Sequence, residues 1–274
     1  SALIIYLFFK HIININLEFY FNLILISFIF FLLGLFDDIK NPKTIIKMFF
    51  ILFFLYLLLL TDKNLIITEL RFKYLTNLNI SLEYLSIPFT MFCIFMFFNA
   101  LNYSDGKNGI SITYSIFLLI LISSTNSNTK IFEHFLVISL LALLFLNLKN
   151  KLFLGNNGVN FLSIFLSLLT IKTYNLNQNN FFCDEIFLLM LIPGMDATRV
   201  TILRIYKKIS PFTPDKRHLH HYLSKFINNN FIWVFYLFLS AMPITLLKIS
   251  SNFYIALAIP TIIYLFLIFR FSKQ

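Results

Sequence analysis

Charged residues are scarce in this chain: Asp, Glu, Lys and Arg make up only 12% of its 274 residues, whereas 59% are hydrophobic. Soluble domains contain roughly 25% charged residues, so a soluble globular protein is excluded. The mean hydropathy is +0.82, and several apolar runs reach the roughly 18 residues that a transmembrane helix requires. The sequence therefore predicts an integral membrane protein.

Cysteine is rare as well. Cys93 and Cys183 lie in or beside apolar segments without the spacing of metal ligands, so neither a disulfide framework nor a zinc site is indicated. Acidic residues are few, with 12 Asp and Glu against 22 Lys and Arg, which gives a formal net charge of +10. In a membrane protein this excess indicates cytoplasmic loops rich in Lys and Arg rather than nucleic-acid binding.

Apolar segments of spanning length recur along the chain. Ser1–Phe9 is apolar but too short to span, and no initiator Met or signal-peptide pattern is present, so we expect an N-terminal truncation within a membrane helix. We predict one all-α domain over residues 1–274, a polytopic membrane helical bundle of about nine to ten transmembrane helices. The expected spans are roughly 18–36, 44–60, 84–101, 110–124, 131–148, 158–174, 182–203, 229–248 and 252–271.

Alternating spans place the connections on two sides of the membrane. Most Lys and Arg lie on one of these sides. Cytoplasmic loops of membrane proteins are characteristically rich in Lys and Arg, so we expect this side to be cytoplasmic. It receives the connections 37–43, 102–109, 149–157 and 204–228. The connection 61–83 falls on the opposite side, where Thr, Ile, Leu and Tyr interspersed with polar residues predict a short hairpin.

Five aspartates also fall on the cytoplasmic side or at its membrane edge: Asp37, Asp38, Asp105, Asp196 and Asp215. Carboxylates at a membrane edge are costly unless they are hydrated, paired or bound to a metal. Their gathering on one face, among many Lys and Arg, predicts a single cytoplasmic polar site. Ionisable residues are nearly absent from the middle of the spans and no internal repeat is visible, so an ion or solute transporter is disfavoured.

Four polar islands on this side carry the candidate functional residues. The first island, residues 34–47, contains the adjacent Asp37 and Asp38 and, further on, Lys47. Adjacent aspartates at a helix end bind a divalent cation, accept a proton or orient a lysine, and such oxygen ligands suit Mg²⁺. An isolated Asp-Asp pair is more often a solvated helix end, so the first island alone leaves both interpretations open.

The second island, residues 98–109, combines Asp105 with three asparagines and two glycines. Asn99 and Asn102 are three positions apart, so on a helix they would share a face and offer oxygens to a metal or amides to a nucleotide. The glycines permit a ligand to approach the backbone closely. An ordinary Asp-Gly turn between two helices accounts for the same residues equally well.

The third island, residues 153–158, places Gly155-Asn156-Asn157-Gly158 at the entrance to an apolar segment. Backbone N–H groups at a helix entrance can bind a phosphate. Glycine and asparagine are also ordinary turn residues, so a plain connector is the alternative interpretation.

The fourth island, residues 193–221, contains Asp196 and ends in a basic cluster. Histidines and arginines suit an anionic phosphate ligand, and the guanidinium group offers it a forked contact. Zinc is less favoured because no Cys or Glu lies at ligand spacing, and a solvated basic loop is the remaining alternative. The basic residues are Arg199, Arg204, Lys216, Arg217, His218, His220 and His221.

Taken in this order, the four islands resemble the polyprenyl-phosphate N-acetylhexosamine-1-phosphate transferases of glycosyltransferase family 4. The resemblance runs from about residue 30 to residue 223 and depends on the ordered set, since each piece alone is weak. Pro214-Asp215 ahead of His-x-His-His is closer to the branch that initiates surface polysaccharides than to the peptidoglycan branch. The matching stretches are Gly34-Leu-Phe-Asp37-Asp38 with Lys47, Asn99-Ala-Leu-Asn102, Asp105-Gly-Lys-Asn108-Gly109, Phe153-Leu-Gly155-Asn156-Asn157-Gly158, and Pro193 to His221.

The resemblance implies transfer of a sugar 1-phosphate from a UDP-sugar to polyprenyl (undecaprenyl) phosphate with release of UMP, as the first membrane step of cell-surface polysaccharide synthesis. It implies Mg²⁺ as cofactor, with Mn²⁺ as an alternative, and a cytoplasmic cleft in the bacterial inner membrane. The expected partners are UDP-N-acetylhexosamine, polyprenyl phosphate and membrane lipid, without nucleic acid, and a homodimer is left open.

The resemblance also implies a role for each matching residue. As catalytic residues it indicates Asp37, Asp38, Lys47, Asp105, His218, His220 and His221. As substrate-binding residues it indicates Asn99, Asn102, Asn108, Gly155, Arg199 and Arg204, and as metal ligands Asn102 and Asn156.

Asn156 departs from the family pattern, which usually presents a metal-ligating Asp at this position. An amide oxygen still coordinates Mg²⁺ but brings no charge, so the affinity for the metal should fall unless Asn102 or an aspartate compensates. Asn108 likewise stands where many bacterial members have Asp, and the family's first helix has no counterpart. A non-catalytic homologue of the family is therefore the alternative to an active transferase.

Overall fold

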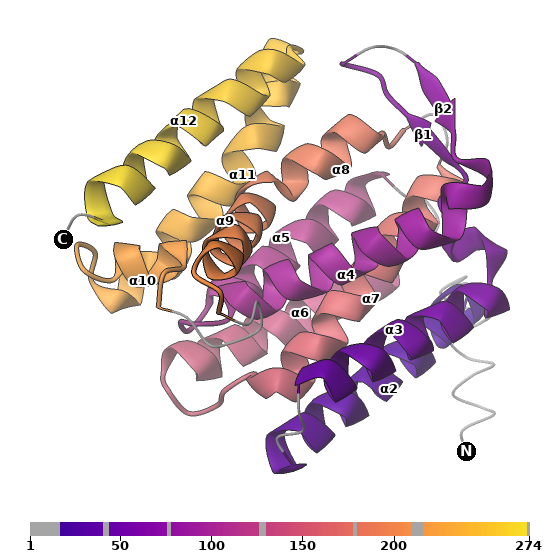
Figure 1. Cartoon of the computed structure of the whole chain (residues 1–274), viewed down its shortest axis with the longest axis horizontal. Coiled ribbons are helices and arrows are strands. Elements are labelled where there is room, and N and C mark those ends of the chain that lie inside the picture. Colours follow the sequence, from indigo (N-terminus) through magenta and orange to yellow (C-terminus); the bar gives the residue numbers. More distant parts are fainter. Residues whose placement is uncertain are drawn as a thin grey trace.

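Helices make up nearly all of the computed structural model, which describes residues 17–40, 44–75, 78–125, 130–177, 180–209 and 216–272 (Figure 1). The all-α prediction is therefore confirmed. The prediction for Ser1–Phe9 and the Ser210–Asp215 part of the fourth island lie outside the described residues. The α-helices are α2 (Leu17–Lys40), α3 (Thr44–Thr61), α4 (Ser86–Ser104), α5 (Ile110–Thr125), α6 (Lys130–Leu148), α7 (Gly155–Leu176), α8 (Cys183–Leu189), α9 (Leu191–Tyr206), α10 (Leu219–Leu223), α11 (Ile232–Ser250) and α12 (Phe253–Ser272). Three short 3₁₀ helices are η1 (Lys63–Leu65), η2 (Glu83–Leu85) and η3 (Asn229–Phe231).

Each of the apolar segments expected from the sequence is helical. Within the described ranges, four helices are long and apolar enough to cross a membrane, or five if the bent pair α8–α9 is one span. α3, α5 and α6 are apolar too, but the described helical stretches that they provide are shorter than the 18 residues required of a spanning helix. An integral membrane protein is supported, whereas the count of nine to ten spans stays a prediction.

The segment expected as one span over 182–203 is broken, and this corrects the sequence-based expectation. α8 and α9 meet at Met190 with a bend of 64°. Pro193 explains the break, because a proline within a helix clashes with the carbonyl group four residues earlier, here that of Leu189. The Leu189 carbonyl instead accepts a hydrogen bond from the Tyr114 hydroxyl at 2.9 Å.

α7 is the central helix of the bundle. Buried positions make up 83% of its apolar window, against 22% for α12, so α7 is surrounded by protein whereas most of the α12 window is not covered by it. Three hydroxyl groups of α7 donate to carbonyl oxygens of the helix itself, which allows polar side chains to be buried there. They belong to Ser163, Ser167 and Thr170.

A two-stranded hairpin marks one end of the bundle and confirms the expectation for 61–83 (Figure 1). β1 (Glu69–Arg71) pairs antiparallel with β2 (Asn79–Ser81). The Arg71 amide donates to the hydroxyl oxygen of Tyr174 near the end of α7, at 2.7 Å. The hairpin is thereby attached to the C-terminal end of α7, and the N-terminal end of α7 lies at the opposite end of the bundle.

Candidate active site

The adjacent aspartates of the first island bind two different elements. The Asp37 carboxylate accepts a hydrogen bond from Lys47 of α3 at 2.5 Å, and the Asp38 carboxylate accepts one from the Asn156 side-chain amide of α7 at 2.7 Å. Negative charge in the last turn of a helix opposes the helix dipole. Lys47 and the N-terminal end of α7 offset that cost, so the first and third islands form one cluster.

Gly34 explains how α2 approaches α7 so closely. A β-carbon at this position would lie 2.5 Å from the Cα atom of Asn157, a distance that real side chains do not reach. Glycine is therefore required where the two helices cross. Gly155, predicted to bind substrate, is the first residue of α7 and has a positive φ of +67°. Gly155 lies beside Asp38, so the start of α7 and the aspartate pair of α2 belong to the same part of the site.

The asparagines of the second island bond backwards along α4. The Asn99 side-chain amide donates to the Phe95 carbonyl at 2.8 Å, and that of Asn102 donates to the Phe98 carbonyl at 2.9 Å. Both amide nitrogens are thus engaged within the helix. This leaves their side-chain carbonyl oxygens as the groups that a ligand could use.

Asn147, which the sequence did not single out, joins the second island to Leu152, the residue immediately before the third island. Its side-chain oxygen accepts from the Gly109 amide at 2.7 Å, and its side-chain amide donates to the Leu152 carbonyl at 2.9 Å. The predicted nucleotide-binding Asn108 contacts the same connection, because its amide donates to Asn150 at 2.6 Å. The end of α6 therefore fixes the turn at 105–109 against the entrance to α7.

Asp105 follows the last residue of α4 and accepts a hydrogen bond from the Ser111 hydroxyl. Burial of the carboxyl group raises its pKa from 3.8 to about 7, and the Ser111 bond only partly opposes this shift. Asp105 is thus close to half ionised near neutral pH. A carboxyl group with such a pKa can take up or release a proton near neutral pH, whereas a catalytic role for Asp105 stays a prediction.

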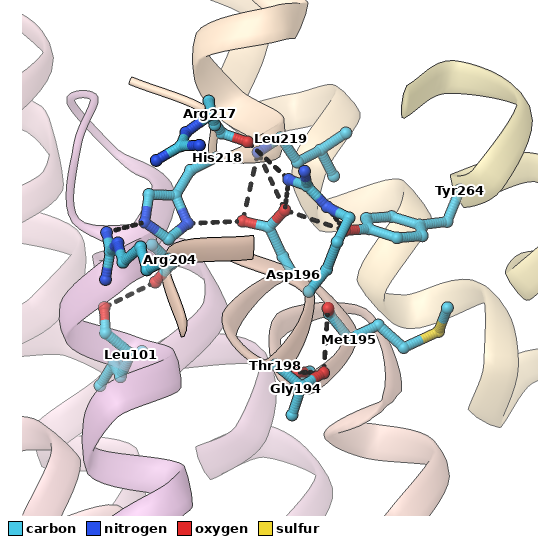
Figure 2. A network of polar contacts seen from close by, with 12 residues as sticks. Leu101, Gly194, Met195, Asp196, Thr198, Arg204, Arg217, His218, Leu219 and Tyr264 are labelled. Atoms are coloured by element: carbon cyan, nitrogen blue, oxygen red, sulfur yellow. Dashed lines mark hydrogen bonds and ion pairs between the residues drawn. The ribbon is translucent and has the colours of Figure 1, made fainter. Parts of the chain in front are cut away.

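Asp196 is the centre of a buried polar network (Figure 2). Its carboxylate accepts hydrogen bonds from His218 Nδ1 at 2.9 Å and from the Leu219 amide at 3.1 Å. It also accepts from Arg199 at 2.8 Å and from the Tyr264 hydroxyl of α12 at 3.0 Å. One side chain of α9 therefore attaches the start of α10 and the C-terminal helix to the bundle.

Both ring nitrogens of His218 are engaged in this network. Arg204 contacts Nε2 at 3.3 Å, and a guanidinium group can only donate, so Nε2 accepts and Nδ1 carries the proton that is donated to Asp196. The ring is 3% exposed. His218, Arg199 and Arg204 were predicted to contact substrate, which stays a prediction, and in the structure all three are engaged with Asp196 or with one another.

His220 differs from His218 in that neither ring nitrogen has a hydrogen-bond partner among the described residues, although the side chain is buried. Burial, together with the neighbouring His221 and His218, lowers its pKa from 6.5 to about 3, so the ring is neutral at physiological pH. Burial likewise lowers the pKa of His221, which is less enclosed. Leaving a buried polar group unpaired costs roughly 1–3 kcal/mol, so His220 is a strong candidate for ligand binding.

Gly106 brings the second island against the fourth. A β-carbon on Gly106 would lie 1.9 Å from Nε2 of His220, so only glycine leaves room for this ring. The turn after Asp105 is thus in van der Waals contact with the histidine cluster. Together with the Asp38–Asn156 bond and the Asn147 bridge, this contact joins all four islands at the end of the bundle opposite the hairpin.

The two predicted metal ligands belong to different helices, α4 and α7. Asn102 precedes the Asp105 turn on α4, whereas Asn156 is bound to Asp38. Within the described ranges, no group of three or more His, Cys, Asp and Glu side chains is arranged to hold a metal ion. The oxygen donors present suit Mg²⁺, which is commonly bound by one or two carboxylates completed by water and substrate phosphates.

Comparison with known proteins identifies the class of this chain. Residues 20–174 match the model of glycosyl transferase family 4, which is more than half of the chain. The chain belongs to this family, and the resemblance inferred from the four islands is confirmed.

The curated relatives agree in their names. The chain is 26% identical over 206 residues to the probable undecaprenyl-phosphate N-acetylglucosaminyl 1-phosphate transferase of Bacillus subtilis (strain 168), covering 73% of this chain and 57% of the relative. It is 24% identical over 146 residues to the undecaprenyl-phosphate alpha-N-acetylglucosaminyl 1-phosphate transferase of Escherichia coli (strain K12), covering 50% of this chain and 40% of the relative. The chain thus spans about half the length of the curated relatives it matches.

Proposed function

We propose that this protein transfers an N-acetylhexosamine 1-phosphate from a UDP-sugar to polyprenyl phosphate, releasing UMP, at a site facing the cytoplasm of a bacterial inner membrane. The observation that supports this most strongly is the continuous set of contacts joining the four polar islands. Carboxylates, a lysine, asparagines and an unpaired histidine lie together at one end of an apolar bundle. Family membership and the names of the relatives point to the same reaction.

The reaction requires two anionic phosphates to approach one another. An oxygen of the acceptor phosphate forms a bond to the β-phosphorus of the UDP-sugar, and the bond from that phosphorus to the oxygen bridging the α-phosphate breaks. The electron pair leaves on UMP. Mg²⁺, when bound, would neutralise phosphate charge, and Asn102, Asn156 and Asp38 are the residues that would hold it.

Each cluster has a separate task in this proposal. Asp37 accepts or orients the proton of the acceptor phosphate, and Lys47 brings positive charge beside it. Asp105 and Asn108 face the nucleotide. Among the histidines, His220 is the one that contacts the diphosphate or sugar, because its nitrogens are unpaired, whereas His218 positions the loop.

An apolar groove supports a lipid acceptor. A cavity of about 350 Å³ lies between α2, α5, α6 and α7 and is lined by aromatic and aliphatic side chains such as Phe31, Leu140 and Phe161. Leu154 and Gly158 of the third island form one end of it. A prenyl chain in this groove would therefore bring its phosphate toward Asn156 and Asp38.

Membranes containing the protein test the proposal when supplied with UDP-GlcNAc, polyprenyl phosphate and Mg²⁺, with UMP as the measured product. We expect Asp38→Asn to abolish UMP release, because the substitution removes the charge at the junction of α2 and α7. Glu83→Gln is the matched control, since this carboxylate lies at the hairpin end and should leave turnover unchanged. If no UDP-N-acetylhexosamine gives UMP with the unsubstituted protein, an active transferase is ruled out.

A further inference from the structure

A small cavity lies behind the Asp37–Lys47 pair. It has a volume of about 20 Å³ and is enclosed by α2, α3 and α7. Most of its lining is apolar, with Leu33, Phe36 and Phe50 among the residues, and the polar side chains in the lining are Asp37, Lys47 and Asn160. A space of this size accommodates a single water molecule, and a water remains there only if polar groups bind it.

Asn160 is a buried polar residue of the central helix whose side-chain oxygen is unsatisfied within the described part of the chain. It is 1% exposed, and its side-chain oxygen has no hydrogen-bond partner among the described residues. The buried Ser163 and Ser167 of the same helix satisfy their hydroxyl groups with backbone carbonyls, whereas the oxygens of Asn160 and Thr173 have no partner among the described residues, and of these two only Asn160 lines the cavity. A buried amide oxygen without a hydrogen-bond partner is costly, which favours a partner that comes from outside the chain.

The position of Asn160 along α7 relates it to Asn156. Residues four apart lie on one face of a helix, so Asn156 and Asn160 both face α2. Asn156 reaches Asp38 directly at 2.7 Å. Asn160 lines the same cavity as Asp37 and Lys47, and these two side chains bond to each other at 2.5 Å.

We propose that this cavity is a water-binding site, in which one ordered water joins the side chain of Asn160 to the Asp37–Lys47 pair. The two asparagines of α7 then hold the two adjacent aspartates of α2, one directly and the other through water. A bridging water is nearly as favourable as a direct hydrogen bond. Asn160 is a positioning residue for Asp37, and its effect on catalysis rests on the proposed function, whereas the water site itself does not.

An experimental structure of the unsubstituted protein, at a resolution that shows ordered water, tests the site directly. We expect density for one water within hydrogen-bond reach of the Asn160 side-chain oxygen and of Asp37 or Lys47. A dry cavity would overturn the proposal. This measurement requires no substrate, so its outcome is decided even if the protein releases no UMP.

Kinetics of three variants test the consequence for Asp37. Asn160→Leu fills a similar volume without polar atoms, and we expect kcat for UMP release to fall roughly fivefold, the equivalent of about one hydrogen bond, with KM for the UDP-sugar unchanged. Asn160→Ser retains a hydroxyl group and leaves room for water, so it should restore most of the loss. Ser167→Ala, a buried polar change on the same helix, is the control and should match the unsubstituted protein. An Asn160→Leu variant with unchanged kcat, or a loss that Asn160→Ser does not relieve, would refute the positioning role.

Discussion

Replacing Asn156 by Asp converts the donor that binds Asp38 into a second carboxylate. In the unsubstituted protein the Asn156 amide donates to the Asp38 carboxylate at 2.7 Å. After the substitution, two acceptors face one another without a proton between them. Without a divalent cation the variant should therefore be less stable, and with a cation between the two carboxylates it should recover.

The magnitude follows from the exposed position of both side chains. Two unit charges about 4 Å apart repel by about 1 kcal/mol in water, and the lost hydrogen bond removes about 1 kcal/mol more. The interaction of the new carboxylate with the helix dipole at the N-terminus of α7 offsets roughly 0.5 kcal/mol of this loss. We therefore expect a net loss of about 1–2 kcal/mol in EDTA. Mg²⁺ at a hundredfold excess over its dissociation constant would add about 2.7 kcal/mol, which is enough to reverse the order of the two proteins.

Thermal unfolding of the purified protein in detergent, with EDTA and then with increasing Mg²⁺, measures both effects. Asn157→Asp is the comparison variant, because it adds the same charge to the same turn of α7 and retains the Asn156 amide that donates to Asp38. We expect the Tm of Asn156→Asp to rise with Mg²⁺ more steeply than that of the comparison variant or of the unsubstituted protein. Equal Mg²⁺ dependence in all three proteins would show that the third island does not contribute a metal ligand.

Three further substitutions test the rest of the site. The folded-state pKa of Asp105, about 7, lies above its ordinary value of 3.8, so the contribution of Asp105 to stability is fully present at low pH and is lost as the pH rises from about 4 to 7. The difference in Tm between the unsubstituted protein and Asp105→Asn should therefore fall over this interval. A constant difference would contradict the burial of this carboxyl group. Gly106→Ala places a methyl group 1.9 Å from Nε2 of His220, so UMP release should fall at least tenfold. A variant that released UMP at the rate of the unsubstituted protein would show that the His220 ring moves away freely. Asp196→Ala leaves Arg199 and His218 without their buried partner and should cost about 3–5 kcal/mol of unfolding free energy, measured by denaturant titration; a loss below about 1 kcal/mol would mean that the network does not hold the loop.

Much of the architecture was predictable because membrane helices and turns depend on local sequence. The long apolar runs became helices, and the polar connection at 61–83 formed the expected hairpin. The break at Met190 was missed, although Pro193 was a visible signal for it. Proline within an apolar run is common enough in membrane helices that its effect depends on whether a partner, here Tyr114, accommodates the freed carbonyl.

The sequence predicted that the four islands gather at one end of the bundle, but not which contacts each side chain makes there. The order of the islands indicated that Asp38, Asp105 and the histidines belong together. Sequence alone does not distinguish His218 from His220, because that difference arises from Asp196 and Arg204, which engage one ring and leave the other unpaired. Asn160 likewise gave no signal, since its burial beside Asp37 depends on the packing of α2 and α3 on α7.

The Tyr264 bond to Asp196 also has a consequence for biogenesis. Tyr264 belongs to α12, which follows α9 and α10 in the chain, and α12 lies beyond the part of the chain that matches the family model. Chains are synthesised from the N-terminus, so α2 and α7 can assemble their aspartate–asparagine contacts while the Asp196 carboxylate still lacks one of its donors. The set of hydrogen bonds around Asp196, which holds the start of the histidine cluster, is therefore complete only after α12 has been inserted.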